Sequence, residues 1–252
     1  MKTAIIIPAR YASRRLPGKP LLRATGKYLV QHVYERACQA REASQVVVAT
    51  DDPRIVAAVE GFGGRVVLTR RDHPSGTDRV AEVARGLDAD LVVNLQGDEP
   101  LIDPAALDLL VALLRRDAGA DLATLAVPIA SRERWQDPNC VKVVCDAGGR
   151  ALYFSRSPIP FVRDGGPDFA AEPPHFLQHL GVYAYRRSFL LDLAGQPPHP
   201  LEQLEQLEQL RALALGRVIQ VGLVRHAAIG VDTYEDYKRF VQVYRAGRRS
   251  AA

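Results

Sequence analysis

The sequence predicts an α/β fold whose central sheet is mostly parallel, with an antiparallel region added in its second half. Short apolar runs alternate with segments of helical spacing through roughly the first 120 residues. This alternation is typical of a parallel sheet that is covered by helices on both faces. After Asp121 the apolar runs follow one another without a long helix between them, which favours antiparallel pairing.

The first half begins with a buried strand at Ala4–Ile7, closed by Pro8. Pro17, Gly18 and Pro20 exclude a regular helix from the loop that follows. Three more strands are expected at residues 46–50, 65–69 and 91–95. Helices are expected at residues 28–41, 54–61, 78–85 and 104–116.

The second half is expected to contain strands at residues 122–127, 141–145, 151–155, 181–185 and 219–224. Gly148-Gly149 marks a hairpin turn. A helix is expected over 201–215, where Leu-Glu-Gln occurs three times, and a last helix over 232–247 is followed by a basic frayed tail at 248–252. The Gly- and Pro-rich segment 163–175 is expected to be an irregular loop, with a lid as one role open to it.

Composition excludes several classes of protein. The 252 residues are 47% apolar and 25% charged, which is ordinary for a globular domain, and no linker divides them. No apolar run approaches the roughly 20 residues of a membrane span, and the first residues do not form a signal peptide. The net charge is only +4, and the three cysteines lack zinc-ligand spacing. We therefore expect a cytoplasmic protein with free thiols that binds neither nucleic acid nor membrane.

The loop after the first strand carries four cations and no acid within ten residues: Arg10, Arg14, Arg15 and Lys19. Ligands of open α/β sheets bind beyond the carboxyl ends of the strands. Arginine binds phosphate oxygens with two parallel N–H groups, and lysine acts as a point charge. The loop lacks the Gly-Lys-Ser/Thr of a Walker A motif and is not a dinucleotide-binding fingerprint. We predict phosphate binding here; the alternative is a solvated basic loop.

A carboxylate follows another buried strand. Asp98 lies in Leu95-Gln-Gly-Asp-Glu-Pro and is expected to face the same crevice as the cationic loop. Magnesium prefers one or two carboxylates together with phosphate oxygens and water. The motif therefore predicts a Mg²⁺ platform for a nucleotide, although an ordinary strand-to-helix turn has the same composition.

The roles of two further loops and of five scattered residues cannot be decided from the residues alone. Ser75 and Gly76 offer a hydroxyl and a close backbone approach to a base, and Asp232 is either a helix cap or a second Mg²⁺ ligand, with capping favoured by the motif itself. The scattered set is not singled out by composition, and each member has an ordinary structural role open to it: Arg156, His179, Tyr183, Glu208 and Gln209.

Together these segments resemble the 3-deoxy-manno-octulosonate (Kdo) cytidylyltransferase family, also called CMP-Kdo synthetases. The resemblance covers essentially the whole chain, in order, and ten ordered motifs are far more specific than any one of them. They are IIPARYASRRLPGKPL, ATDDPRI, HPSGTDR, VNLQGDEP, TLAVPI, PNCVKVV, ALYFSRSPIP, FLQHLGVYAYR, PLEQLEQLEQLR and GVDTYED.

The resemblance implies a Rossmann-like, GT-A-type nucleotidyltransferase fold, a homodimer and Mg²⁺ as cofactor. The implied reaction is CTP + Kdo → CMP-Kdo + pyrophosphate, which feeds lipopolysaccharide synthesis. It implies one domain, in which about 1–120 and 219–252 form the nucleotide-binding core and about 121–218 the sugar-binding and dimerisation sub-region. No covalent intermediate is expected, so no nucleophilic triad is needed.

By motif position, the resemblance assigns roles to individual residues. Arg10, Arg15 and Lys19 hold the triphosphate, and Ala9, Ser75, Gly76 and Gln96 lie near the cytidine. Asp98 binds Mg²⁺ and Asp232 helps to hold a second ion, so the capping role favoured above is replaced. The sugar acid is surrounded by the scattered set: Arg156, His179, Tyr183, Glu208 and Gln209. The sequence departs from the family pattern at Arg14, Tyr234, Gln203 and Gln206, none of which is expected to act directly.

Three alternatives stay open at this point. A cytidylyltransferase for another 2-keto sugar acid, such as sialic acid or 8-amino Kdo, would bind CTP in the same way. A hexose-1-phosphate nucleotidyltransferase is disfavoured because the first loop lacks a Gly-rich opening. A non-catalytic nucleotide-binding module is disfavoured because both Asp98 and Asp232 accompany the cationic loop.

Overall fold

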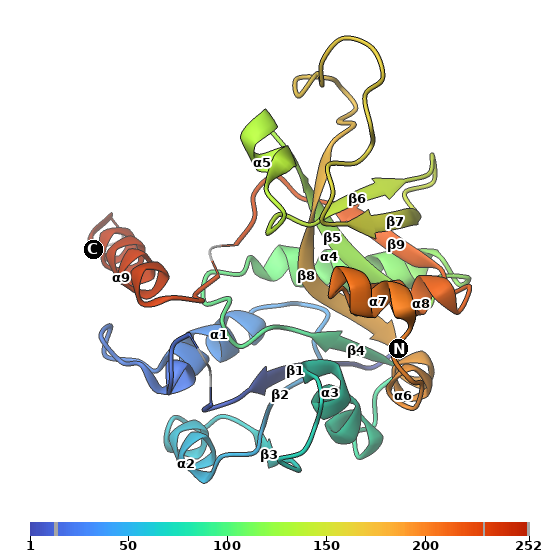
Figure 1. Ribbon diagram of the computed structural model, residues 1–252. Coiled ribbons are helices and arrows are strands. Elements are labelled where there is room, and N and C mark those ends of the chain that lie inside the picture. Colours follow the sequence, from blue (N-terminus) through green and yellow to red (C-terminus); the bar gives the residue numbers. More distant parts are fainter. Residues whose placement is uncertain (13–14, 229, 251–252) are drawn as a thin grey trace. The chain divides into compact units, whose positions relative to one another are not determined.

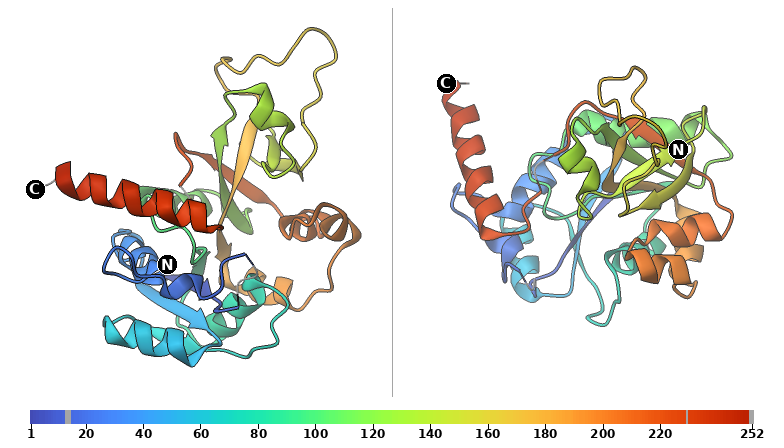
Figure 2. Two further views of the ribbon diagram at one scale, coloured as in Figure 1. Left: turned by 60° about the vertical axis from the view of Figure 1, so that its left-hand side comes forward. Right: turned by 45° about the horizontal axis from the view of Figure 1, so that its top comes forward.

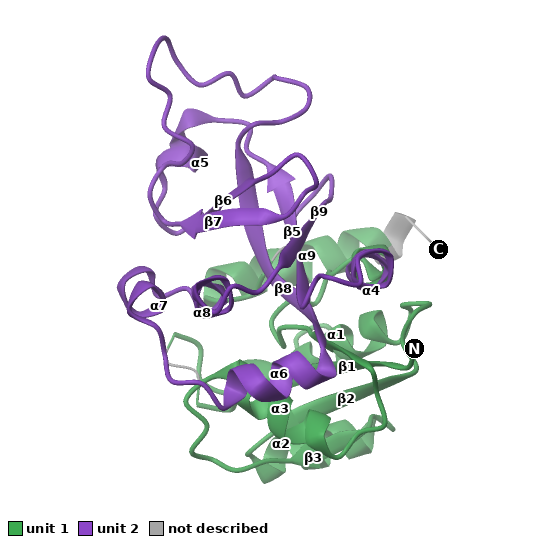
Figure 3. Cartoon of the chain, turned by 90° about the vertical axis from the view of Figure 1, so that its right-hand side faces the viewer, with its two compact units in different colours: residues 1–108, 228–252 green, residues 109–227 purple. Residues whose placement is uncertain are grey.

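The computed structural model describes residues 1–12, 15–228 and 230–250, with only the backbone of 248–250. Arg14, one of the four cations of the loop after the first strand, lies outside the described residues. The chain divides into two compact units, Met1–Asp108 with Ala228–Ala252, and Leu109–Ala227 (Figure 3). The expectation of one domain with two sub-regions stays a prediction.

The first unit is built on a parallel sheet in the order β3-β2-β1-β4 (Figure 1). The strands are β1 (Thr3–Ala9), β2 (Gln45–Thr50), β3 (Val66–Leu68) and β4 (Leu91–Asn94). Ile5 of β1 is paired with Val46 on one side and Val93 on the other, and all three are buried. Strands that are buried on both faces read as apolar runs, which is why the sequence predicted them correctly.

Helices α1 (Leu29–Ala37), α2 (Pro53–Gly61) and α3 (Gly76–Arg85) connect these strands, as parallel pairing requires. Asp52 caps α2, and Ser75 caps α3 by accepting from the backbone N–H of Asp78. The predicted helix over 28–41 is shorter than expected, because α1 ends at Ala37.

The last helix, α9 (Tyr234–Ser250), closes a core cluster of the first unit. Phe240 and Tyr237 pack there with Leu29 and with Leu16, a residue of the cationic loop. Leu16 therefore anchors the cationic loop to the core of the first unit. The frayed tail predicted for 248–252 is wrong for 248–250, where the helix continues, and residues 251–252 lie outside the description.

The second unit contains α4 from Leu109 onward (Pro104–Arg116 in full) and a mixed set of strands. Strand β5 (Leu122–Pro128) pairs antiparallel with β8 (Leu177–Arg186) and parallel with β9 (Ile219–Leu223). Strands β6 (Lys142–Cys145) and β7 (Ala151–Ser155) form the predicted hairpin, and β6 also pairs with β8. The antiparallel region is thus confirmed. Its helices are α5 (Arg132–Gln136), α6 (Arg187–Ala194), α7 (Pro200–Glu205) and α8 (Gln209–Ala214).

The single helix predicted over 201–215 is wrong, because Gln206 has a left-handed backbone (φ 53°) that separates α7 from α8. A period of three carries the leucines around a continuous helix instead of along one face. The break leaves Leu204 80% exposed but lets Leu207 and Leu210 point into the core. Helix α6 was not predicted at all, and β8 is longer than the predicted strand at 181–185.

The segment 163–175 has no helix or strand, as predicted, and both views of Figure 2 show it as part of the gold loop between β7 and β8. Phe169 holds it to the second unit, with ring centroids 5.1 Å from Phe176 and 6.4 Å from Trp135. Its role as a lid stays a prediction.

Candidate active site

The strand order of the first unit reverses between β1 and β4. From β1 the chain moves to β2 and β3 on one side, and β4 then pairs on the opposite side of β1. Such a switch point opens a crevice at the carboxyl ends of the two central strands. The cationic loop follows β1 and the Gln96–Asp98 segment follows β4, so both predicted motifs lie at this crevice.

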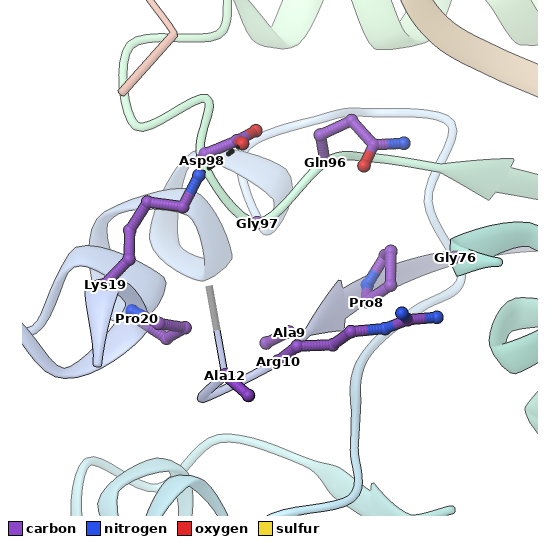
Figure 4. Close-up of a pocket in the computed structure, with 10 residues that line it drawn as sticks. All are labelled: Pro8, Ala9, Arg10, Ala12, Lys19, Pro20, Gly76, Gln96, Gly97 and Asp98. Atoms are coloured by element: carbon purple, nitrogen blue, oxygen red, sulfur yellow. Dashed lines mark hydrogen bonds and ion pairs between the residues drawn. The ribbon is translucent and has the colours of Figure 1, made fainter. Parts of the chain in front are cut away.

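A pocket of about 270 Å³ lies there (Figure 4). Six of the predicted nucleotide and metal residues line it: Ala9, Arg10, Lys19, Gly76, Gln96 and Asp98. A Cβ atom on Gly97 would lie 2.8 Å from the Pro8 carbonyl oxygen, so glycine is required for this close approach of the two loops. The sequence therefore predicted most of the lining, although three predicted residues are not part of it: Arg15, Ser75 and Asp232.

Two carboxylates meet at one ammonium beside this pocket. Lys19 Nζ, only 13% exposed, donates to Asp98 Oδ2 at 2.7 Å and to Asp232 Oδ1 at 3.4 Å. Arg15 reaches the same Asp232 oxygen at 3.2 Å. The backbone N–H of Val231 donates to the Asp98 carbonyl oxygen at 2.8 Å, which joins the two acidic segments. Lys19 and Arg15 neutralise the two carboxylates here, and carboxylate oxygens are the ligands that a divalent ion such as Mg²⁺ prefers.

Asp232 does not cap the last helix, and the capping role favoured by its motif is wrong. Thr233 and Asp236 make the capping hydrogen bonds: the Asp236 carboxylate accepts from the Thr233 backbone at 2.9 Å, and the Thr233 hydroxyl accepts from the Asp236 backbone at 3.2 Å. The Asp232 side chain instead faces Lys19 and Arg15.

Arg10 is oriented by the loop before α3. Its guanidinium donates to the His73 carbonyl oxygen at 3.1 Å, and the His73 ring pairs with the Glu82 carboxylate. Burial, followed by the charge of Arg79, lowers the pKa of Arg10 from its usual value. Because Arg10 stays charged even so, this desolvation strengthens its attraction for an anion in the pocket.

The scattered set of five residues gathers in the second unit. The ring centroids of His179 and Tyr183 lie 5.4 Å apart on β8, and the charge of Glu208 contributes to raising the pKa of Tyr183. Arg156 Nε donates to the Glu205 carbonyl oxygen at 2.7 Å, three residues before Glu208. Gln209 is buried, and its Nε2 atom has no hydrogen-bond partner. A buried amide without a partner is costly and points to a polar ligand.

His179 is held in one neutral form. Burial lowers its pKa to about 3. Its Nε2 lies 3.0 Å from Thr124 Oγ1, while that hydroxyl has two carbonyl oxygens, of Leu180 and Val182, as acceptors. Two carbonyl oxygens compete for the one proton of the hydroxyl, which favours the form in which Nε2 donates to the hydroxyl oxygen and Nδ1 is an acceptor. Burial likewise raises the pKa of Tyr183 well above its usual value, so its phenol stays protonated.

Comparison with known proteins shows to which family the chain belongs. A family model of cytidylyltransferases matches residues 4–219. The 3-deoxy-manno-octulosonate cytidylyltransferase of Syntrophobacter fumaroxidans is 54% identical, over 96% of this chain and 97% of that protein. That of Geobacter sulfurreducens is 51% identical, over 96% and 99%. This chain belongs to the 3-deoxy-manno-octulosonate cytidylyltransferases.

The solved structures agree with this family. A CMP:2-keto-3-deoxy-manno-octonic acid synthetase complexed with CTP superposes with a TM-score of 0.91, at 45% identity over 98% of this chain and all of that one. A 4-diphosphocytidyl-2C-methyl-D-erythritol synthase from Anaerococcus prevotii, 14% identical with a TM-score of 0.63, shares the fold. The cytidylyltransferase fold predicted from the motifs is confirmed.

Sequence reasoning about this cytidylyltransferase missed Lys142. It is fully buried at the start of β6 and donates only to backbone carbonyls. A signal was present, because a lysine interrupts the apolar run Val141–Cys145 that was predicted as a buried strand.

Among the described residues of the enzyme, no helix has the length and apolar character needed to cross a bilayer.

Proposed function

We propose that this chain transfers the cytidylyl group of CTP to Kdo, giving CMP-Kdo and pyrophosphate for lipopolysaccharide synthesis, with Mg²⁺ held by Asp98 and Asp232. Family membership supports the reaction. The observation that carries the site assignment is the meeting of both carboxylates at Lys19, beside a pocket at the switch point of the sheet.

The acidic pair fits the proposed metal. Within the described part of the chain no group of three or more His, Cys, Asp or Glu side chains forms a metal cage. Asp98 lines the pocket, and Asp232 meets it at the Lys19 ammonium. One or two carboxylates are the ligand set that Mg²⁺ uses when phosphate oxygens and water complete its coordination. When bound, Mg²⁺ would supply charge neutralisation and Lewis acidity at the triphosphate. Its occupation would also release Lys19 from the acids.

Residues of the first unit then bind the triphosphate. Arg10 is oriented by the His73 carbonyl, and Lys19, once released, can bind phosphate oxygens from the edge of the same pocket. In the reaction the anomeric oxygen of Kdo forms a bond to the α-phosphorus, and the bond from that phosphorus to the bridging oxygen of pyrophosphate breaks. Lys19, Arg15 and Arg10 stabilise the negative charge of the leaving pyrophosphate. Ser75, Gly76, Gln96 and the Ala9 backbone are assigned to the cytidine.

Residues of the second unit bind the sugar acid in this proposal. The Arg156 guanidinium is held by backbone carbonyls and keeps its full positive charge for a carboxylate. His179 Nδ1 can accept from a sugar hydroxyl, and the unpartnered Gln209 amide can donate to one. Tyr183 and Glu208 complete the set. We also expect a cytoplasmic homodimer.

Pyrophosphate release tests the function. Purified protein with CTP and Mg²⁺ would be compared in the presence of Kdo, sialic acid, 8-amino Kdo and no acid. Release with Kdo alone is the expected result. Release with a different acid alone would show that this acid is the substrate, while the reaction class would stay the same. Binding of CTP without any release of pyrophosphate would favour the non-catalytic module. Omission of Mg²⁺ in the presence of a chelator should abolish release, whereas undiminished release would contradict the metal assignment.

A further inference from the structure

Lys142 is a fully buried cation with no acidic partner. It opens β6, opposite Ser155 of β7, and its side chain is 0% exposed. No carboxylate of a described residue lies within 4 Å of its ammonium. Lysine is almost never fully buried without a charged partner, because the ammonium loses its hydration. Burial accordingly lowers the pKa of Lys142 from its usual value. Such a costly arrangement calls for a specific role.

The three ammonium protons are matched by three backbone carbonyl oxygens. Lys142 Nζ donates to the carbonyls of Asp137 at 2.9 Å, Cys140 at 2.6 Å and Arg156 at 2.5 Å. An ammonium has three donors, so this set satisfies it completely. Two of the carbonyls belong to the turn between α5 and β6, and the third follows the end of β7. Lys142 therefore joins two segments that share no regular hydrogen-bonding pattern.

The turn between α5 and β6 also holds the Arg156 side chain, together with the end of α7. Arg156 donates to the Pro138 carbonyl at 2.9 Å, and Pro138 lies in the turn between Asp137 and Cys140. Its backbone N–H donates to the Glu205 carboxylate at 2.9 Å, and its Nε to the Glu205 carbonyl at 2.7 Å. Lys142 thus fixes both the backbone carbonyl of Arg156 and the turn that receives its guanidinium.

We propose that Lys142 is a positioning residue for cytidylyl transfer, which holds Arg156 in the direction that receives the carboxylate of the acidic sugar. The inference rests on the proposed function, through the role given there to Arg156. It explains why three N–H donors are buried at this point where an apolar side chain would fill the same space. Lys142 does not touch the substrate in this account, and it acts only through the backbone and side chain of Arg156.

The test is the steady-state kinetics of Lys142→Met, which keeps an unbranched side chain and removes the donors. The KM for Kdo should rise roughly 10-fold or more, since hydrogen bonds to a charged group are lost, while the KM for CTP stays within about twofold. Val143→Ala, the neighbouring buried residue of β6, is the matched control for a weakened strand and should leave both KM values unchanged. In the Arg156→Gln background, adding Lys142→Met should change the KM for Kdo only slightly, because the residue that Lys142 positions is already lost.

The outcomes separate the inference from the proposed function. If the wild-type protein releases no pyrophosphate with CTP and any sugar acid, the proposed function fails first. If the wild type is active and the KM for its acid is unchanged in Lys142→Met, or rises equally in Val143→Ala, the positioning role is overturned. Should Lys142→Met not fold, Lys142→Gln keeps two donors and carries the same test with a smaller expected rise; an unchanged KM there would equally overturn the role.

Discussion

One pair of cations in the first unit and one pair in the second are held in opposite ways; Arg10 of the first unit, which donates to the His73 carbonyl oxygen, belongs to neither pair. In the first unit, Lys19 and Arg15 are paired with the carboxylates of Asp98 and Asp232. In the second unit, Lys142 and Arg156 are held by neutral backbone carbonyls. A cation that is neutralised by an acid must change partner before it can bind an anion. A cation that is held by carbonyls keeps both its position and its charge.

The contrast agrees with the part of the reaction that we propose for each unit. The pair of Arg15 with Asp232 is 68% and 49% exposed, so it contributes little stability and can exchange easily. This suits the role proposed for the first unit, which is to admit a metal ion and a triphosphate together. The carbonyl-held cations are preorganised, which suits recognition of a single carboxylate with little loss of entropy on binding. Four predictions follow this contrast.

The largest effect is expected at the acidic pair. Asp98→Asn keeps the shape of the side chain but removes its charge, and turnover at saturating substrates should fall by about 10³-fold, the order seen when a key electrostatic contact is lost. Pyrophosphate release measures this. Asp88→Asn, an exposed acid paired with Lys2, is the control and should stay at the wild-type rate. A rate within tenfold of the wild type in Asp98→Asn would contradict the metal assignment.

Replacing Lys19 should weaken the binding of CTP and strengthen the binding of Mg²⁺. Lys19→Met removes a phosphate-binding charge, so the KM for CTP should rise on the order of 100-fold, near the upper end for hydrogen bonds to charged groups. It also removes the cation that competes for Asp98 and Asp232, so Mg²⁺ should bind the free protein more tightly than it binds the wild type. Calorimetric titration with Mg²⁺ checks the second effect. Weaker Mg²⁺ binding would show that Lys19 does not compete with the ion.

Replacing Arg156 should affect the sugar acid alone. Arg156→Gln should raise the KM for Kdo by roughly 10- to 100-fold, the cost of losing a charge-assisted hydrogen bond, and leave the KM for CTP unchanged. Arg134→Gln, whose partner is Asp137 on the surface of the same unit, serves as the control. If both variants behave alike, the effect of Arg156 is structural and not a matter of substrate recognition.

The smallest effect concerns stability in acid. His179 has a pKa of about 3, below its ordinary value of 6.5, so the unfolded chain binds the extra proton between these values and stability falls as the pH drops through this window. The His179→Gln side chain can still donate to Thr124 but does not titrate. Between pH 7 and pH 5 its free energy of unfolding should therefore fall by about 1 to 2 kcal/mol less than that of the wild type. Urea unfolding at the two pH values measures the difference. An equal loss in both proteins would mean that His179 is not buried in its neutral form.

The sequence predicted the first unit better than the second, for physical reasons. Parallel strands buried on both faces appear as apolar runs, and their carboxyl ends share one edge, so Asp98 and Lys19 could be placed together before the structure was known. The Lys19 contact with Asp232 could not be derived from spacing, because 213 residues separate them.

In the second unit the decisive contacts involve backbone groups, which composition does not reveal. The three carbonyls around Lys142 come from a turn and a strand end, and their convergence depends on tertiary packing. The left-handed Gln206 that ends α7 was equally hidden within a repeat of good helix formers. The five residues that we propose for the sugar acid were therefore assigned through family resemblance and not through spacing.

The most direct test of the division between the units is equilibrium binding of CTP to Lys19→Met and Arg156→Gln, measured side by side with the wild type. We predict that affinity for CTP falls at least roughly tenfold in Lys19→Met, which loses a charged contact, and stays within twofold in Arg156→Gln. Equal losses in both variants, or a loss only in Arg156→Gln, would contradict the assignment of the nucleotide to the first unit and of the sugar acid to the second.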